Sequence, residues 1–163
     1  MPFVAPQLTR DRRRGFTLPE LLIVLTVLSV LLGVGIPSFI EFMRNQRVKT
    51  ASFDLFSTLV HARSEAITRN ATVTVAPVSS AWTNGWTVTD AGGTVIRSMS
   101  SVTNVSITRI DTGPASVQFR ASGRLNATVM PAFELTAEGG TITTRCISID
   151  LSGRPVTKAA ACT

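Results

Sequence analysis

Residues Leu21 to Ile40 have the sequence LLIVLTVLSVLLGVGIPSFI, twenty consecutive positions without a charged side chain. A helix of this length rises about 30 Å, which matches the hydrocarbon thickness of a bilayer. A cleavable secretory signal is one alternative, but the stretch is longer than such an apolar region, and no small-x-small site with a clear break follows it. A buried helix of a soluble core is the other alternative. We expect the segment to span a membrane.

Basic residues flank the apolar segment on both sides. Four arginines precede it and three cations follow it: Arg10, Arg12, Arg13, Arg14, Arg44, Arg47 and Lys49. Their distribution favours a cytoplasmic N-terminus by a narrow margin. Cys146 and Cys162 support the same orientation, because a disulfide between them would persist only in an oxidising compartment outside the cytoplasm. We therefore expect a single span with the C-terminal part outside the cytoplasm.

Two residues at the start of the apolar segment are unusual. The Glu20 carboxylate costs on the order of a few kcal/mol in a membrane unless it is paired, and Pro19 inside a continuous helix clashes with the carbonyl four residues back. Cleavage between Gly15 and Phe16 would place Pro19 in the first helical turn, whose N–H groups have no partner in any case. It would also create an α-amino group with a pKa of about 7.7–8.0. Because a helix cannot easily fold its own terminus onto Glu20, we expect the terminus of a neighbouring chain as the partner.

The stretch from Arg12 to Leu22, RRRGFTLPELL, resembles the class III signal of type IV pilins and pseudopilins. The resemblance rests on the Gly15–Phe16 junction and on Glu20, four residues after Phe16. It implies removal of residues 1–15 by an inner-membrane prepilin peptidase, N-methylation of Phe16, and pairing of Glu20 with the terminus of an adjacent subunit. Pro19 stands where an aliphatic residue is more usual, and its place in the first turn explains why it is tolerated.

Four later segments resemble the FimT/FimU/GspH group of minor pilins and pseudopilins. They are ARSEAI (62–67), WTNGWTVTD (82–90), FRASGRL (119–125) and CISIDLSGRPV (146–156). Together with the N-terminal signal they cover most of the chain. The resemblance implies a pilin-like fold and partners that are other minor pilins and the major pilin, or pseudopilins.

Beyond the apolar segment the pattern becomes that of an amphipathic helix ending near Arg69. Apolar residues recur every three or four positions, with three more widening the stripe: Val48, Ala51, Leu55, Leu59, Ala62 and Ala66, then Phe56, Val60 and Ile67. This helical region, residues 41–69, follows the hydrophobic helix of residues 16–40. We expect its apolar face to pack on a sheet formed by residues 70–163.

From Ala71 onward Thr, Val and Ile dominate and the period becomes two, as strands require. The expected strands are Thr72–Val78, Gly85–Asp90, Thr94–Met99, Val102–Ile110, Ser116–Arg120, Ala132–Thr136, Thr141–Ile149 and Arg154–Lys158. Turn residues predict hairpins at 91–93 and 111–114 and a reversal at 150–153. The predicted fold class is α+β, a long helix packed on an antiparallel β-sheet domain.

The composition provides little for catalysis. One His and two Cys are too few for a closed four-ligand zinc site, and no nucleophile elbow, phosphate-binding loop or dinucleotide motif occurs. His61 is expected to be structural, Glu65 and Arg69 to form a surface ion pair, and Trp82 and Trp86 to fill the core. We predict a protein that is not an enzyme and uses no metal or other cofactor.

Cys146 and Cys162 enclose the final strand. We expect them to form a disulfide that holds the C-terminal tail against the sheet, worth about 3 kcal/mol for a loop of this size. A free reactive thiol is the alternative.

A nucleic-acid role is weighed from local clusters, because the net charge of +6 owes much to the arginines of the first fifteen residues. Some members of the FimT group resemble DNA receptors and carry a C-terminal Gly-Arg-x-Arg motif. Here the corresponding residues are Gly153-Arg154-Pro155-Val156, so the second Arg is missing. Arg145, Arg154 and Lys158 are the candidate DNA contacts.

Three functions from different classes follow. The first is a minor pilin, a structural subunit near the tip that helps to prime assembly of a type IV pilus. The second is a pseudopilin of a type II secretion system, and the third is a FimT-like DNA-binding component for natural transformation. The C-terminal Cys pair, which closes a terminal loop, resembles that of pilus minor subunits more than secretion pseudopilins and so favours the first. In each case the expected location is the bacterial inner membrane, with the C-terminal domain in the periplasm and incorporation into a filament after processing.

Overall fold

The computed structural model describes residues 15–138 and 144–162. The expected leader, apart from Gly15, and the first three residues of the expected strand 141–149 lie outside this range. The chain divides into two compact units at the boundary between Phe39 and Ile40. Helix α1 (Leu18–Arg69) supplies residues to both units.

The part of α1 in the second unit is amphipathic, as its sequence predicts. Its buried face consists of residues that are at most 2% exposed: Val48, Ala51, Leu55, Leu59, Ala62 and Ala66. The expected widening of this face is only partly correct. Phe56 is half-buried, but Val60 and Ile67 are 44% and 51% exposed. At 100° per residue both lie about 120–140° from Leu55, outside the buried face.

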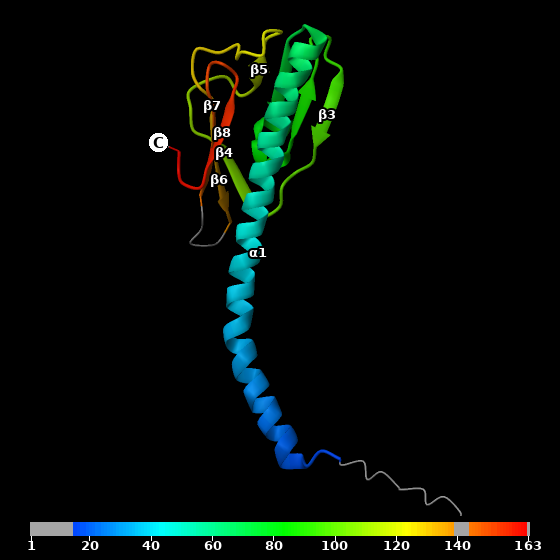
Figure 1. The fold of residues 1–163 in the computed structure, drawn as a ribbon, viewed down its shortest axis with the longest axis vertical. Helices are drawn as coiled ribbons and strands as arrows, with labels where there is room; N and C mark the ends of the chain where they lie inside the picture. The colour runs from blue at the N-terminus through cyan, green and yellow to red at the C-terminus, as the bar shows by residue number, and fades with distance from the viewer. Residues whose placement is uncertain (1–14, 139–143, 163) are drawn as a thin grey trace, which may run out of the picture. The chain divides into compact units, whose positions relative to one another are not determined.

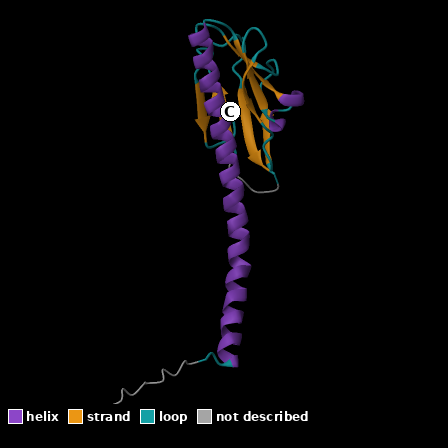
Figure 2. Cartoon of the chain, turned by 90° about the vertical axis from the view of Figure 1, so that its right-hand side faces the viewer, coloured by secondary structure: helices purple, strands orange, loops and turns teal. Residues whose placement is uncertain are grey.

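Eight strands occur in the described part of the second unit, and each overlaps an expected strand. They are β1 (Val73–Pro77), β2 (Trp86–Thr89), β3 (Val95–Met99), β4 (Val105–Arg109), β5 (Val117–Phe119), β6 (Ala132–Ala137), β7 (Arg145–Ile149) and β8 (Pro155–Lys158). They form two antiparallel sheets, with strand orders β3-β2-β1-β5 and β4-β6-β7-β8. Within this unit the sheets lie alongside the helix (Figure 1), and loops connect the strands (Figure 2). The α+β fold class is confirmed.

Two of the three predicted reversals are confirmed. Residues 91–93 join β2 to β3, where Asp90 Oδ1 accepts hydrogen bonds from the N–H groups of Gly92 and Thr94 at 2.9 and 2.8 Å. Residues 150–153 join β7 to β8. The prediction of a hairpin at 111–114 is wrong, because β4 pairs with β6 whereas β5 pairs with β1. This segment carries the chain from one sheet to the other.

A partly buried ion pair explains why residues 111–114 do not close a hairpin. The Arg109 guanidinium donates to both carboxylate oxygens of Asp111 at 2.6 and 2.8 Å, and the two side chains are only 9% and 7% exposed. Asp111 also accepts from the N–H of Ala132 at 3.0 Å, at the start of β6. Arg109 donates to the carbonyls of Pro114 and Ser116. These bonds direct the chain away from β4 and fix the crossover.

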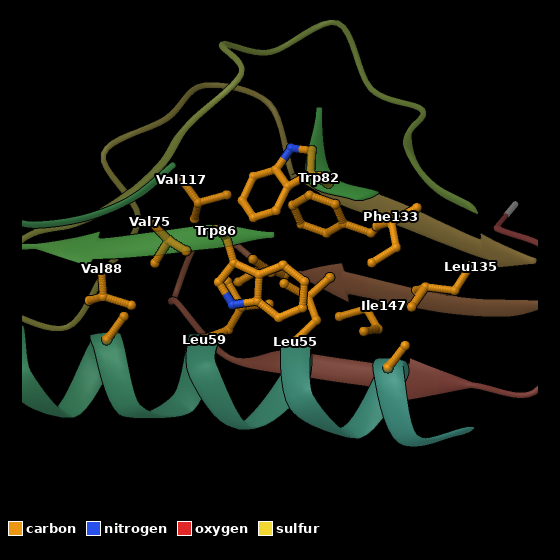
Figure 3. Close-up of a cluster of buried hydrophobic side chains, with 14 of the residues drawn as sticks. Leu55, Leu59, Val75, Trp82, Trp86, Val88, Val117, Phe133, Leu135 and Ile147 are labelled. Carbon is orange, nitrogen blue, oxygen red and sulfur yellow. The ribbon is translucent and has the colours of Figure 1, made fainter. Parts of the chain in front are cut away.

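The core joins α1 to both sheets around two tryptophans. Trp86 of β2 lies against Leu55 and Leu59 of the helix (Figure 3), and its Nε1 donates to the buried hydroxyl of Thr58 at 3.1 Å. Trp82, in a short 3-10 helix (Trp82–Asn84), packs edge-on against Phe133 of the second sheet at 4.7 Å between ring centroids. Both indoles are buried. The prediction that they fill the core is confirmed.

Candidate functional site

The start of α1 contains the residues of the predicted processing signal. Gly15, Phe16 and Thr17 precede the helix, and Phe16 is 78% exposed. The helix begins at Leu18, so Pro19 lies in the first turn, where the sequence argument places it. The first backbone bond runs from Leu21 N–H to Thr17 O at 3.1 Å.

The Glu20 carboxylate caps this helix start. One oxygen accepts from the backbone N–H of Thr17 at 3.5 Å, so the side chain is turned toward the N-terminus. Residues 17–20, Thr-Leu-Pro-Glu, fit the capping-box pattern in which an acidic residue three positions after the cap reaches back to its N–H. The carboxylate reaches within one residue of Phe16. This capping interaction was missed from the sequence, although the Thr-x-x-Glu spacing is its signal.

The apolar segment that follows has no protein partner among the described residues. An 18-residue window of this segment has a mean hydropathy of 2.4, and none of the window is buried, so the helix is long and apolar enough to cross a membrane. Two of its hydroxyl groups are satisfied within the helix, because Thr26 donates to Ile23 O at 2.8 Å and Ser29 to Leu25 O at 2.7 Å. These two polar groups therefore do not oppose an apolar environment around the segment.

The C-terminal tail is attached to the second sheet as predicted. Cys146 of β7 and Cys162 form a disulfide. Cys162 Sγ also lies 3.4 Å from the carbonyl oxygen of Phe133 in β6. The bridge therefore holds residues after β8 against the sheet.

The three candidate DNA contacts do not share one face of their sheet. The register pairs Ile147 with Thr157 and Cys146 with Lys158. Since side chains alternate along a strand, Arg154 and Lys158 lie on the face of Cys146, whereas Arg145 lies on the opposite face, that of Ile147. The register thus places Arg154 and Lys158 on one face, about 13 Å apart along the strand, and separates Arg145 from them.

The remaining polar residues singled out from the sequence form a surface cluster on α1. Glu65 accepts from Arg69 Nε at 2.6 Å, and this hydrogen bond lowers the pKa of Glu65 below its usual value. His61 Nε2 lies 3.7 Å from the same carboxylate. The expected surface ion pair of Glu65 and Arg69 is confirmed. Within residues 15–138 and 144–162, no group of three His, Cys, Asp or Glu residues is arranged to hold a metal ion.

Two solved structures have the same fold. The type IV minor pilin FimU of Pseudomonas aeruginosa strain PAO1 superposes with a TM-score of 0.62 and 22% identity, over 72% of this chain and 92% of that chain. The minor pseudopilin EpsH of the type 2 secretion system of Vibrio cholerae superposes with a TM-score of 0.55 and 13% identity, over 69% and 97%. At these identities the likeness shows the pilin-like fold alone.

Sequence comparisons match the N-terminal segment and the rest of the chain separately. "Prepilin peptidase-dependent protein D" of Escherichia coli K12 is 37% identical over 54 residues, which are 33% of this chain and 34% of that protein. A model described as "Prokaryotic N-terminal methylation motif" matches residues 10–36. A second, described as "Type II transport protein GspH", matches residues 51–153, more than half of the chain. The chain therefore belongs to the GspH family of minor pilins and pseudopilins, whose members are structural subunits and not enzymes.

Proposed function

We propose that the chain is a minor pilin that helps to prime assembly of a type IV pilus and lies near its tip. The observation that supports this most directly is the start of α1, an exposed apolar helix whose first turn holds the Glu20 carboxylate toward the N-terminus. Other minor pilins and the major pilin are the proposed partners. The FimU structures, described as those of a type IV minor pilin, add support through the shared fold.

The proposed assembly step depends on two groups at the helix start. A prepilin peptidase cleaves between Gly15 and Phe16, and the new terminus of Phe16 is N-methylated. The terminal amine is largely cationic at neutral pH, with a pKa of about 7.7–8.0. In an apolar environment the Glu20 carboxylate needs a cation, and the amine of a neighbouring subunit supplies it.

The proposed location follows from the same features. Before assembly the chain is a single-pass protein of the bacterial inner membrane, with its N-terminus in the cytoplasm and the domain of residues 70–163 in the periplasm. The disulfide between Cys146 and Cys162 suits an oxidising compartment. After processing the chain leaves the membrane for the filament.

Processing is tested by intact-mass analysis of the chain purified from its host membrane. The expected mass corresponds to loss of residues 1–15 and gain of one methyl group on Phe16. A chain that still begins at Met1 contradicts the processing step.

The role of Glu20 is tested with two substitutions. Glu20→Ala removes both the capping acceptor and the charge, whereas Glu20→Gln keeps an oxygen that can accept from Thr17 N–H. If the charge pairs with a neighbouring amine, both variants stay in the membrane yet incorporate poorly into filaments. If only the cap matters, Glu20→Gln incorporates like the unsubstituted chain, and the proposed pairing is wrong.

A pseudopilin of a type II secretion system is the second candidate. The description of the matching family model, "Type II transport protein GspH", favours it, and EpsH shares the fold. The C-terminal disulfide is our reason for placing the pilus first. Deleting the gene distinguishes the two, since loss of surface pili supports the first and loss of protein export with intact pili supports the second.

DNA uptake is the weakest of the three functions on this geometry. With Arg145 on the other face of the sheet, only Arg154 and Lys158 remain on one face, four residues apart and therefore about 13 Å apart along the strand. Each phosphate contact adds about 0.9 to the log–log salt slope, so two or three contacts give only weak binding. We expect affinity for duplex DNA no better than high-micromolar at roughly 150 mM salt. Sub-micromolar binding abolished by Arg154→Gln contradicts this expectation.

A further inference from the structure

Two turns from distant parts of the chain have the same sequence and the same backbone bond. The tripeptide Ser-Gly-Arg occurs at residues 122–124, after β5, and again at residues 152–154, between β7 and β8. In each turn the glycine N–H donates to the carbonyl three residues earlier, at 2.8 Å for Gly123 and 2.9 Å for Gly153. Both turns therefore have the same backbone hydrogen bond, and in each an arginine follows the glycine.

The two turns are packed directly against each other. Gly123 and Gly153 have φ values of 73° and 82°, which favour glycine. A Cβ on Gly153 would collide with the carbonyl oxygen of Gly123 and would lie 3.4 Å from the Cα of Arg124. The contact between the glycines thus places Arg124 beside Arg154, the residue that follows Gly153.

The end of α1 continues this surface. Arg63 Nε donates to the Gly123 carbonyl at 3.1 Å, and Ile67 lies against Gly123, since a Cβ there would be 2.7 Å from Ile67 Cδ1. Leu125 N–H donates to Leu151 O at 3.3 Å and so links the second turn to the first. We call this surface the double-turn surface. It consists of three arginines and two aliphatic residues: Arg63, Arg124, Arg154, Ile67 and Leu151.

This surface combines positive charge with exposed apolar area. Arg124 and Arg154 are exposed, and within residues 15–138 and 144–162 neither forms an ion pair. The carboxylate of Asp150 lies in the second turn, where it accepts from Ser152 Oγ at 2.6 Å and from Arg154 N–H at 2.9 Å. These bonds and the charge of Arg154 lower the pKa of Asp150, so this carboxylate offsets part of the positive charge. Ile67 and Leu151 are 51% and 41% exposed. The surface is therefore complementary to a partner that offers carboxylates around an apolar patch.

We propose that the double-turn surface docks a second pilin-type subunit through carboxylates of that subunit. This proposal rests on the proposed function, because it assumes assembly with other subunits. The mixture of arginine and aliphatic side chains is typical of the centre of protein interfaces. Nucleic-acid interfaces are more polar and use more cations than the three arginines of this surface supply.

The test places a photo-reactive amino acid, p-benzoylphenylalanine, at Leu151 of the full chain in its native host. The control position is Val95 of β3, which is 55% exposed and belongs to the other sheet. We expect a cross-link at Leu151 to a protein that itself carries an N-terminal methylation motif. Arg124→Glu combined with Arg154→Glu should reduce this adduct at least about tenfold.

The matched control makes the same change of charge elsewhere. Arg97→Glu combined with Lys158→Glu alters two other exposed cations and should leave the adduct at Leu151 unchanged. Replacing the partner carboxylates nearest the cross-link with Lys should restore the adduct to the Arg124→Glu, Arg154→Glu chain. An adduct that the double reversal leaves unchanged overturns the proposal.

The remaining outcomes separate this proposal from the proposed function. If the chain is recovered in sheared filaments but Leu151 yields no pilin-type adduct, only the docking proposal fails. If the unsubstituted chain never enters filaments, the proposed function fails and the docking proposal fails with it. DNA binding is measured with the full chain in detergent and a fluorescent duplex of roughly 30 base pairs. Sub-micromolar binding that is lost in the Arg124→Glu, Arg154→Glu chain would assign the surface to DNA instead.

Discussion

The two parts of α1 show how one helix is stabilised in two different ways. The part up to Phe39 is apolar around the helix after Glu20, and its described side chains are exposed, whereas residues 40–69 bury one face against two sheets and turn charged residues outward. Leu28 and Leu59 illustrate the difference, being 47% and 0% exposed. The first part depends on an apolar environment outside the chain, and the second on the chain's own sheets.

The difference extends to hydroxyl groups. Thr26 and Thr58 both donate to carbonyls of their own helix, at 2.8 Å each. Thr58 in addition accepts from Trp86 Nε1 and so connects the helix to a sheet. The Thr26 hydroxyl thus only satisfies its own hydrogen bond within the helix, whereas the Thr58 hydroxyl also joins the helix to a sheet.

The largest expected effect comes from shortening one leucine in each part. Leu59→Ala should lower the free energy of unfolding of the domain by about 2–5 kcal/mol, because it leaves a cavity in the core. Leu28→Ala should change it by less than about 0.5 kcal/mol. Urea unfolding of the full chain in detergent, followed by the fluorescence of Trp82 and Trp86, measures both. Equal losses would contradict the division of the helix.

The disulfide should matter only to the domain. Cys146→Ser or Cys162→Ser should lower its free energy of unfolding by about 2–4 kcal/mol and loosen the tail after β8. Detergent-bound helix content of residues 18–39 should stay unchanged in the same variants. Thiol labelling of the unreduced, unfolded chain is the control, and two reactive thiols would show that the bridge is absent.

A smaller effect is expected from the two threonines. Thr58→Val removes the acceptor of a buried indole N–H and should cost about 1–3 kcal/mol, the cost of an unsatisfied buried donor. Thr26→Val removes a hydroxyl that only its own helix uses and should be close to neutral. The same urea experiment compares them. A Thr58→Val chain as stable as the unsubstituted one would mean that the Trp86 bond contributes nothing.

Periodicity was enough to predict the helix and its buried face, because a stripe every three or four residues has one geometric interpretation. It also located all eight strands, since alternation and turn residues are local signals. The separation into two sheets was not predictable in this way. It depends on Arg109 bonding to Asp111 and on Asp111 accepting from the first residue of β6, and the sequence carries no local signal for these contacts.

The candidate sites were predictable to different degrees. Pro19 in the first turn and the Cys146–Cys162 bridge followed from steric and redox arguments. The cap formed by Glu20 was missed although Thr17 and Glu20 have its spacing. Whether Arg145, Arg154 and Lys158 share a face was not predictable, because the face of a residue depends on register, which the sequence alone leaves open. The contact between Gly123 and Gly153 was equally inaccessible, since it joins two turns far apart in the chain.

The last prediction concerns acid pH and again should affect only the domain. Burial raises the pKa of Asp111, but the hydrogen bonds from Arg109 and from the N–H groups of Ala132 and Gly113 outweigh it, so the pKa lies below its usual value. A carboxyl whose pKa is lower in the folded chain stabilises it fully above the unfolded pKa, about 3.9. This stabilisation is lost as the pH falls through the folded pKa.

We therefore expect the Asp111 contribution to domain stability to be constant between pH 7 and about pH 5 and to decline below about pH 4, at no more than about 1.4 kcal/mol per pH unit. Asp111→Asn, although less stable at neutral pH, should lack this part of the decline, and urea unfolding of both chains across the range measures the difference. The helix content of residues 18–39 in detergent should not follow the same curve, because no Asp111 bond reaches that part of the chain. An Asn variant with the same acid profile as the unsubstituted chain would mean that the crossover between the sheets does not depend on the charge of Asp111.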